Sequence, residues 1–412
     1  MTQGAPATKP LAIAFAGLLA LAVAMGIGRF AFTPLLPMML HDGVTDLPAA
    51  SWLATANYVG YWLGALACAL QPMLWARWRV ATPLAHTVAV RCGLVATVLL
   101  TLAMAQPWSA AWPLWRLLAG VASAFVFVYS SGWCLARLTA LGAPSLAGII
   151  FVGPGLGITV SGLAASAMVA HGWSAANAWL VFGLLAAVLS ALAWPQLRGA
   201  VVVTTPSRTA GHAEQRGEMA LFTLAYGLAG FGYIVTATFL PVIARQALPG
   251  SFWLDLFWPL FGLGVAAGAL LTLRLPMRWD RRKLLMACYT MQALGVLMSV
   301  WLPSLLGFAL GSLLLGLPFT AITLFALQEA RRLRPHNASA FIGVLTAAWG
   351  LGQIAGPPLV ALLLHRSASA GQGFALSLQA AASALLLGVV VFGWLVRRHP
   401  LGRDAAAVAA QR

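Results

Sequence analysis

The chain has 412 residues, of which 61% are hydrophobic and only 8% are charged. So few polar groups cannot cover a water-soluble surface of this size, so the composition excludes an ordinary soluble protein and indicates one that lies in a lipid bilayer. The formal net charge is +16. The basic residues are scattered over loops between apolar segments instead of gathering on one soluble face, so we expect no nucleic-acid partner.

Twelve apolar segments follow one another along the chain. A spanning helix needs about 20 apolar residues, and the segments begin near residues 11, 51, 84, 111, 145, 175, 218, 251, 284, 305, 339 and 373. Pro and Gly inside them do not exclude helices, because neighbouring helices re-satisfy freed backbone groups in a packed bundle. The sequence therefore predicts an all-α membrane protein with twelve transmembrane helices.

The second half of the sequence repeats the first. The segment from Gly28 to Pro37 matches the segment from Gly232 to Pro241, 204 positions later, and Gly60-x-x-x-Gly64 matches Gly264-x-x-x-Gly268. The match predicts two pseudo-symmetric six-helix bundles, at 1–195 and 218–398, with a cytoplasmic linker at 196–217 and a tail at 399–412. Substrate sites of repeat-built transporters lie where the copies meet, so transport of a small molecule is the leading hypothesis.

Basic residues predict the orientation. Only Arg245 and Arg366 flank the spans on one side of the membrane. The positive-inside rule therefore predicts that the other side, with both termini, faces the cytoplasm, in a bacterial inner membrane. The 19 basic residues on the predicted cytoplasmic side are Lys9, Arg77, Arg79, Arg137, Arg198, Arg208, Arg216, Arg274, Arg278, Arg281, Arg282, Lys283, Arg331, Arg332, Arg334, Arg397, Arg398, Arg403 and Arg412.

In the first span, Arg29 is the candidate contact for an anionic group of the substrate. A guanidinium at this depth is costly and usually faces the bundle interior or a water-filled cavity. Gly26 and Gly28 before it, and Pro34 and Pro37 after it, are expected to weaken the helix and expose backbone groups there. The alternative is that Arg29 is a structural pin on carbonyls freed by the prolines, or snorkels outward. Its repeat counterpart is Tyr233, which suits an asymmetric ligand.

Other polar and aromatic residues are expected to face the same cavity. Tyr and Trp also serve as anchors at membrane interfaces, so this set mixes two possible roles. The set is Asn57, Tyr58, Tyr61, Tyr129, Ser130, Tyr226, Thr236, Trp349 and Gln353.

Two segments resemble signatures of the major facilitator superfamily, a twelve-helix, two-bundle transporter fold. Arg116-Leu117-Leu118-Ala119-Gly120 in the fourth span is similar to its Arg-x-x-x-Gly signature. Gly148 with Gly153-Pro154-Gly155-Leu156-Gly157 in the fifth span is similar to the Gly-Pro signature that the family associates with antiporters. Gly153-Pro154 and its repeat Gly356-Pro357 are expected to bend their helices. Such a bend either controls leakage between the halves or has no gating role.

Further resemblance narrows the family. The loop motif between its second and third helices remains only as Arg77 and Arg79, without the acidic residue, and the copy Trp279-Asp280-Arg281-Arg282-Lys283 is better kept. The stretches 26–37 and 52–61 resemble the YbfB/YjiJ-type branch. The resemblance covers nearly the whole chain and implies a transporter, without naming a substrate.

For proton coupling, the resemblance points to Arg116, although a pin holding the fourth helix is an equal alternative. Of the few carboxylates, Asp255 is the better candidate, because it shares the depth of Arg29 and Arg116 and an Arg–Asp contact there would open on protonation. The alternative is that Asp255 suits the positive end of a helix dipole. Glu329, beside Arg331 and Arg332, is expected to form a solvated cytoplasmic pair.

Three hypotheses follow. The first is proton-coupled efflux (antiport) of a small organic solute by a monomeric carrier surrounded by membrane lipid. The second keeps the fold and reverses the direction, with Arg29 as the clamp of an organic anion taken up. The third, a membrane enzyme or sensor, is disfavoured, because no metal-spaced His/Asp cluster, Ser-His-Asp set or phosphate-gripping loop is present in the sequence. We expect no cofactor and no metal.

Overall fold

Each apolar segment of the sequence forms one helical span of membrane length in the computed structural model. The model describes residues 9–78, 85–199, 215–248, 250, 252–276, 279–334 and 338–400. In this part of the chain twelve helical spans are long and apolar enough to cross a membrane, and each begins within a few residues of the predicted position, which confirms the all-α membrane fold. Residues 200–214 of the predicted linker and 401–412 of the predicted tail lie outside the described residues.

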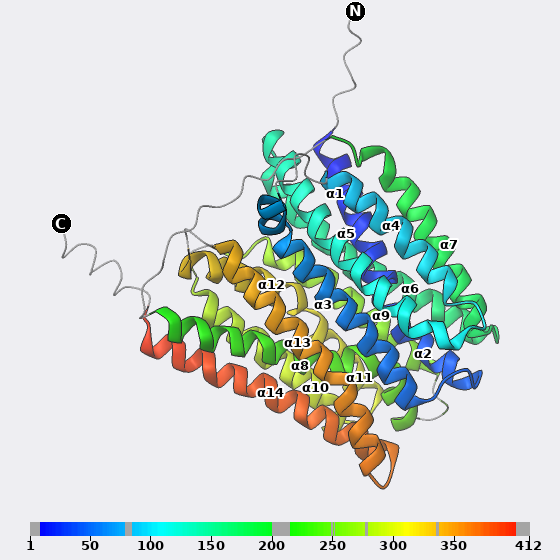
Figure 1. Cartoon of the computed structure of the whole chain (residues 1–412). Coiled ribbons are helices and arrows are strands. Elements are labelled where there is room, and N and C mark those ends of the chain that lie inside the picture. Colours follow the sequence, from blue (N-terminus) through cyan, green and yellow to red (C-terminus); the bar gives the residue numbers. More distant parts are fainter. Residues whose placement is uncertain are drawn as a thin grey trace, which may run out of the picture.

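The first half of the chain contributes six spans (Figure 1). They are formed by α1 (Pro10–Leu21), η1 (Ala22–Ile27) and α2 (Phe32–His41); α3 (Leu47–Trp78); α4 (His86–Ala103); η2 (Ser109–Ala111) and α5 (Trp112–Ala140); η3 (Pro144–Phe151) and α6 (Val152–Ala170); and α7 (Ala175–Ala193) with η4 (Trp194–Gln196).

The second half contributes the other six, drawn from green to red in Figure 1. They are α8 (Gln215–Ala247); η5 (Phe252–Leu256) and α9 (Phe257–Thr272); α10 (Arg281–Trp301); α11 (Leu305–Gly316) and α12 (Phe319–Leu333); α13 (Ala338–Arg366); and α14 (Ala370–Arg398). Because each half has six spans, α1 begins and α14 ends at the same end of the bundle. We call this the terminal end, and the opposite end the loop end.

The first span is the irregular one, as its glycines and prolines predict. After α1 the chain runs through a π-helix, η1, and a turn at residues 28–31 before α2 begins. Pro34 and Pro37 have no N–H, so they cannot donate the usual helical hydrogen bonds. The backbone around Arg29 is therefore open to side chains from other helices.

Within each half, glycines let helix backbones touch. A Cβ on Gly60 would overlap the carbonyl of Leu117, and a Cβ on Gly268 would overlap the carbonyl of Leu317. These positions belong to the two repeated Gly-x-x-x-Gly pairs, so the repeat seen in the sequence is also a repeat in packing.

Two seams join the halves along their sides. In the first, α6 lies against α9 so closely that a Cβ on Gly155 would overlap the backbone of Ala266. In the second, α3 lies against α13, where the indole N–H of Trp62 donates to the carbonyl of Ala347 at 3.1 Å.

The halves also meet at the loop end. There the hydroxyl of Thr33 on α2 donates to the carbonyl of Ala237 on α8 at 2.8 Å. At the terminal end, α5 and α12 share no extended packing contact in the described part of the chain. The halves are thus held together more tightly at the loop end than at the terminal end.

Candidate functional site

Arg29 is the first-half end of a hydrogen-bonded bridge between the halves. Its side chain is buried, and Nη2 donates to Oε1 of Gln353 on α13 at 2.6 Å. The amide nitrogen of Gln353 in turn donates to the hydroxyl of Tyr233 on α8. The chain thus brings together residues of the first, seventh and eleventh spans, all three of which the sequence analysis had placed in the cavity.

Aromatic rings surround this bridge on both sides. The guanidinium carbon of Arg29 lies 4.0 Å from the ring centroid of Tyr61 and 5.4 Å from that of Tyr58, both on α3. In the second half, the Trp349 ring lies 5.2 Å from that of Tyr233 and 4.8 Å from that of Tyr226. The faces of Tyr58 and Tyr61 attract the guanidinium, and the three rings of the second half pack against one another.

The Arg29 guanidinium has no carboxylate partner among the described residues. Its Nε atom has no hydrogen-bond partner there, and its described ring and amide contacts are all uncharged. A charge buried in a membrane protein is ordinarily paired with an opposite charge or faces a water-filled path. The described residues therefore leave the positive charge of Arg29 uncompensated, and one negative charge from outside the protein would neutralise it.

Arg116 makes the contacts of a structural pin. Its guanidinium donates to the carbonyls of Gly28 at 3.4 Å and Arg29 at 3.3 Å, which lie in the turn that interrupts the first span. The amide of Asn57 donates to the carbonyl of Arg116 at 2.9 Å and ties α3 to the same point. Arg116 and Asn57 thus hold the backbone that presents Arg29, and their predicted roles in coupling and substrate binding stay predictions.

Three further cavity candidates are Tyr58, Thr236 and Ser130. The hydroxyls of Tyr58 and Thr238 are 2.8 Å apart, which joins α3 to α8. Thr236 is buried, and its hydroxyl has no partner among the described residues. Ser130 on α5 is likewise buried with an unpaired hydroxyl.

The predicted partner of Asp255 was wrong. Its carboxylate pairs with Arg245, at the end of α8, and not with Arg29 or Arg116. The backbone carbonyl of Asp255 accepts a hydrogen bond of 3.0 Å from Ser166 on α6, so this part of η5 is fixed by contacts with α8 and α6 near the loop end. Arg245 lies only ten positions from Asp255, in the last turn of α8. Position along a helix sets the depth of a side chain but not which neighbouring residue it faces.

Tyr129 also lies apart from Arg29. It donates to Gln71, and its ring is 5.2 Å from that of His86. These residues lie towards the terminal end of the first half, so Tyr129 belongs to a separate contact between α3, α4 and α5.

The predicted bend positions occupy different settings. Gly153 and Pro154 follow the 3₁₀ segment η3 at the start of α6, and Gly153 packs on the carbonyl of Leu18. Gly356 and Pro357 lie inside α13, which continues from Ala338 to Arg366. A gating role at either place stays a prediction.

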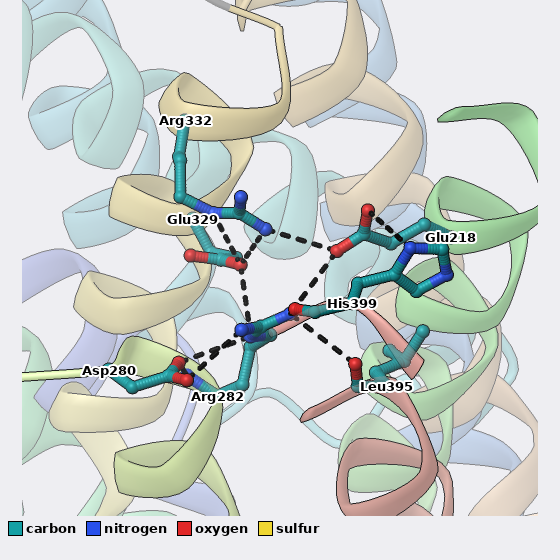
Figure 2. Close-up of polar contacts among 7 residues, drawn as sticks. All are labelled: Glu218, Asp280, Arg282, Glu329, Arg332, Leu395 and His399. Carbon is teal, nitrogen blue, oxygen red and sulfur yellow. Dashed lines mark hydrogen bonds and ion pairs between the residues drawn. The ribbon is translucent and has the colours of Figure 1, made fainter. Parts of the chain in front are cut away.

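A buried ionic cluster at the terminal end was missed by the sequence analysis (Figure 2). Arg282 on α10 is fully buried and contacts the carboxylates of Glu218 at 3.5 Å, Asp280 at 3.0 Å and Glu329 at 3.7 Å. Arg332 on α12 lies 3.0 Å from Glu218 and 2.8 Å from Glu329. Glu329 thus pairs with Arg332, but the expectation that this pair is solvated was wrong, since Glu329 is only 1% exposed.

The end of α14 closes this cluster. Arg282 donates to the carbonyls of Leu395 at 3.4 Å and His399 at 2.7 Å, and the imidazole of His399 lies 3.9 Å from Glu218. The spacing of Asp280 with Arg282 and of Glu329 with Arg332 was a signal in the sequence, but it does not reveal that four helices meet there.

Asp280 belongs to this cluster and lies outside the membrane-spanning segments. Burial raises the pKa of its carboxyl, but hydrogen bonds from Arg282 and the positive charges of Arg282 and Arg332 outweigh burial and hold the pKa below its usual value. Asp280 is thus held in its charged form.

A cavity of about 500 Å³ opens at the terminal end, between α8, the end of α12 and the start of α13. Its lining includes Arg216, Met219, Thr223, Arg334, Phe341 and Val344. In the described residues, His, Cys, Asp and Glu form no group of three or more that could hold a metal ion.

Comparison with known proteins agrees with this architecture. The family model described as "Uncharacterised MFS-type transporter YbfB" matches residues 21–392. No curated protein matches the sequence significantly.

Solved structures of transporters have the same fold. A mutant of the nucleoside transporter NupG superposes with a TM-score of 0.72 at 14% identity, over 94% of this chain and 99% of that one. A bacterial homologue of the human lysosomal transporter Spinster, in an inward-facing and unoccupied conformation, gives 0.64 at 12% identity, over 95% and 98%. The human organic anion transporter MFSD10 (TETRAN) gives 0.61 at 16%, over 94% and 100%.

Proposed function

Because the chain belongs to the YbfB-type family of major facilitator superfamily transporters, we propose that it carries a small organic anion across the membrane by alternating access, with Arg29 as the substrate contact. It is a multi-pass membrane transporter and not an enzyme. The substrate class and the role of Arg29 form the proposal.

The observation that carries the proposal is the uncompensated charge of Arg29. The guanidinium is buried between the halves, and its hydrogen-bond acceptor, Gln353, is neutral. A carboxylate of a solute would accept a charge-assisted hydrogen bond from Arg29, which is stronger than the bond to an amide oxygen. Tyr61 and Trp349 supply aromatic faces for the organic part of such a solute.

The contacts between the halves support alternating access. Arg29, Tyr58 and Thr33 reach across to the second half on the side of the loop end, whereas α5 and α12 stay apart at the terminal end. A solute is therefore proposed to exchange with the terminal side in this conformation. The excess of basic residues assigns the terminal side to the cytoplasm by the positive-inside rule.

The test is a thermal-shift screen of the purified protein and its Arg29→Gln variant against organic acids, sugars, amino acids and cationic drugs. A ligand present at 100 times its dissociation constant stabilises the native state by about 2.7 kcal/mol. An organic anion is expected to raise the melting temperature of the wild type and not that of the variant. Arg366→Gln, which removes an exposed arginine at the loop end, is the matched control and should respond like the wild type.

Stabilisation of wild type and Arg29→Gln to the same extent by neutral or cationic compounds would refute the clamp. Arg29 would then be a pin that holds the halves together through Gln353.

Export in exchange for protons is the second candidate. It is favoured by the packing of the Gly-Pro segment, where a Cβ on Gly153 or on Gly157 would overlap the backbone of the first span. Such contact leaves no room for water between α6 and α1, and an exchanger needs a path that protons do not leak through. In proteoliposomes with an imposed pH gradient, exchange predicts that the solute moves opposite to the protons. A flux that ignores the gradient would exclude it.

A further inference from the structure

We propose that the cavity at the terminal end is a second binding site, which takes the anionic head of an amphipathic organic anion and passes the molecule on to Arg29. The inference deepens the proposed function, because it defines the substrate class as anions with an apolar body. It assigns a role to the two arginines of the cavity, Arg216 and Arg334, which the sequence analysis had counted only towards membrane orientation.

The charges of the cavity differ from those of the neighbouring ionic cluster. In the cluster, Arg282 and Arg332 face the carboxylates of Glu218 and Glu329. In the cavity, the described lining residues include two arginines and no acidic residue.

Arg334 shows the difference most clearly. Its Nε donates to the thioether sulfur of Met219 at 3.3 Å, and in the described residues no carboxylate pairs with it. A thioether is a weak acceptor. The half-buried guanidinium of Arg334 is therefore available to an external anion, and Arg216 adds an exposed second charge at the mouth.

The rest of the lining is apolar. Met219, Phe341 and Val344 form the wall, with the hydroxyl of Thr223 among them. A volume of about 500 Å³ lies in the range of small-molecule sites. An inorganic anion would leave this wall unused, whereas an aromatic or aliphatic acid would cover it.

Two helices of the cavity, α8 and α13, also carry the residues of the bridge to Arg29. On α8, Thr223 is followed at intervals of three and seven residues by Tyr226 and Tyr233, which share a face at helical spacing. On α13, Trp349 follows Phe341 at an interval of eight residues, and Gln353 follows Trp349 at an interval of four. At 1.5 Å per residue, Thr223 and Tyr233 are about 15 Å apart. The aromatic residues thus connect the two arginine sites over a length that one or two small molecules span.

The experiment measures binding of naphthalene-2-sulfonate by calorimetry in nanodiscs of phosphatidylcholine. This probe has one negative charge and an apolar body, and neutral 2-naphthol is its matched control ligand. The variants are Arg216→Gln/Arg334→Gln and Arg29→Gln. Arg331→Gln is the matched control variant, because it removes an exposed arginine at the end of α12, close to Arg334 in the sequence, that does not line the cavity.

The double variant is expected to lose about tenfold in affinity at one class of site, since each charge-assisted contact is strong only while the charge is present. Arg331→Gln should bind as the wild type does, and 2-naphthol should not distinguish the variants. Unchanged sulfonate binding in the double variant would overturn the second site.

Two further arms separate the possible outcomes. If Arg29→Gln keeps the binding that the double variant loses, the cavity binds the anion without Arg29. The second site is then supported, and a failure of the proposed clamp at Arg29 would not affect it. If phosphatidylglycerol in the nanodisc abolishes sulfonate binding to the wild type, the cavity holds a lipid headgroup, and its assignment to a solute is overturned.

Discussion

The hydroxyl of Thr33 donates a hydrogen bond of 2.8 Å to the carbonyl of Ala237, and these two residues are counterparts in the two halves of the sequence. Two positions that are related by a pseudo-twofold axis and touch each other must lie beside that axis. At the loop end, the axis therefore passes between α2 and α8, beside Thr33, in the same span as Arg29.

A cross-link between Thr33→Cys and Ala237→Cys is expected to stop transport. Oxidation would fix α2 to α8 and prevent the loop end from opening, and reduction would restore flux. The measurement is flux of the anion found by thermal shift, in a background where the four native cysteines are replaced by alanine. Thr33→Cys alone, treated with the same oxidant, is the control. Full flux in the oxidised double variant, with the disulfide verified by mass spectrometry, would contradict closure at this contact.

Gln353→Glu is expected to occupy Arg29 from within the protein. A carboxylate 2.6 Å from the guanidinium would replace the solute's charge, so anion affinity should fall by about tenfold or more, while thermal stability without ligand rises. Gln372→Glu adds the same charge at an exposed site of α14 and should leave affinity unchanged. Undiminished anion binding to Gln353→Glu, measured by calorimetry, would argue against a substrate contact at Arg29.

Gly268→Ala tests the backbone contact inside the second half. Its new Cβ would overlap the carbonyl of Leu317, so the helices must separate, at a cost of about 1–3 kcal/mol in the free energy of unfolding. Gly371→Ala is the control, because a Cβ there meets no atom within 4 Å. The two variants are compared by denaturant unfolding in detergent, and equal stability would show that the contact relaxes freely.

Arg282→Met is expected to destabilise the terminal end severely. It leaves the carboxylates of Glu218, Asp280 and Glu329 close together without their shared cation, and breaking a buried ion pair in this way costs about 3–5 kcal/mol. Lys283→Met removes a neighbouring exposed charge and should change stability by about 0.5 kcal/mol or less. A melting temperature of Arg282→Met equal to that of Lys283→Met would mean that the cluster contributes little.

Asp280→Asn tests the depressed pKa of this carboxyl. A pKa that is lower in the folded state stabilises the protein above the unfolded value, 3.8, and this stabilisation disappears as the pH falls through the folded value. The stability difference between wild type and variant should thus stay constant from about pH 8 to pH 5 and shrink only below about pH 4. A difference that already closes between about pH 8 and pH 6 would assign the dependence to another group.

The spans could be predicted because each depends on a local run of apolar residues, and the burial of Arg29 because a charge in such a run is exceptional. The partner of Arg29 could not, since Gln353 lies 324 positions away and only the packing of the two halves brings them together. The partner of Asp255 was mispredicted for a related reason, because the depth of a residue along its helix does not determine which neighbouring side chain it faces. Glu329 was misplaced because the burial of its carboxylate depends on Arg282, from another helix.

The seam between α6 and α9 has a mechanical consequence. Gly155 brings the two helix backbones into direct contact there, so no long side chain has to interdigitate or release. A close backbone contact of this kind can act as a pivot. When two rigid halves rotate relative to each other, atoms near the rotation axis move least and atoms far from it move most. The bridge of Arg29 and Gln353 would then be broken by leverage from this pivot, with little rearrangement at the seam itself.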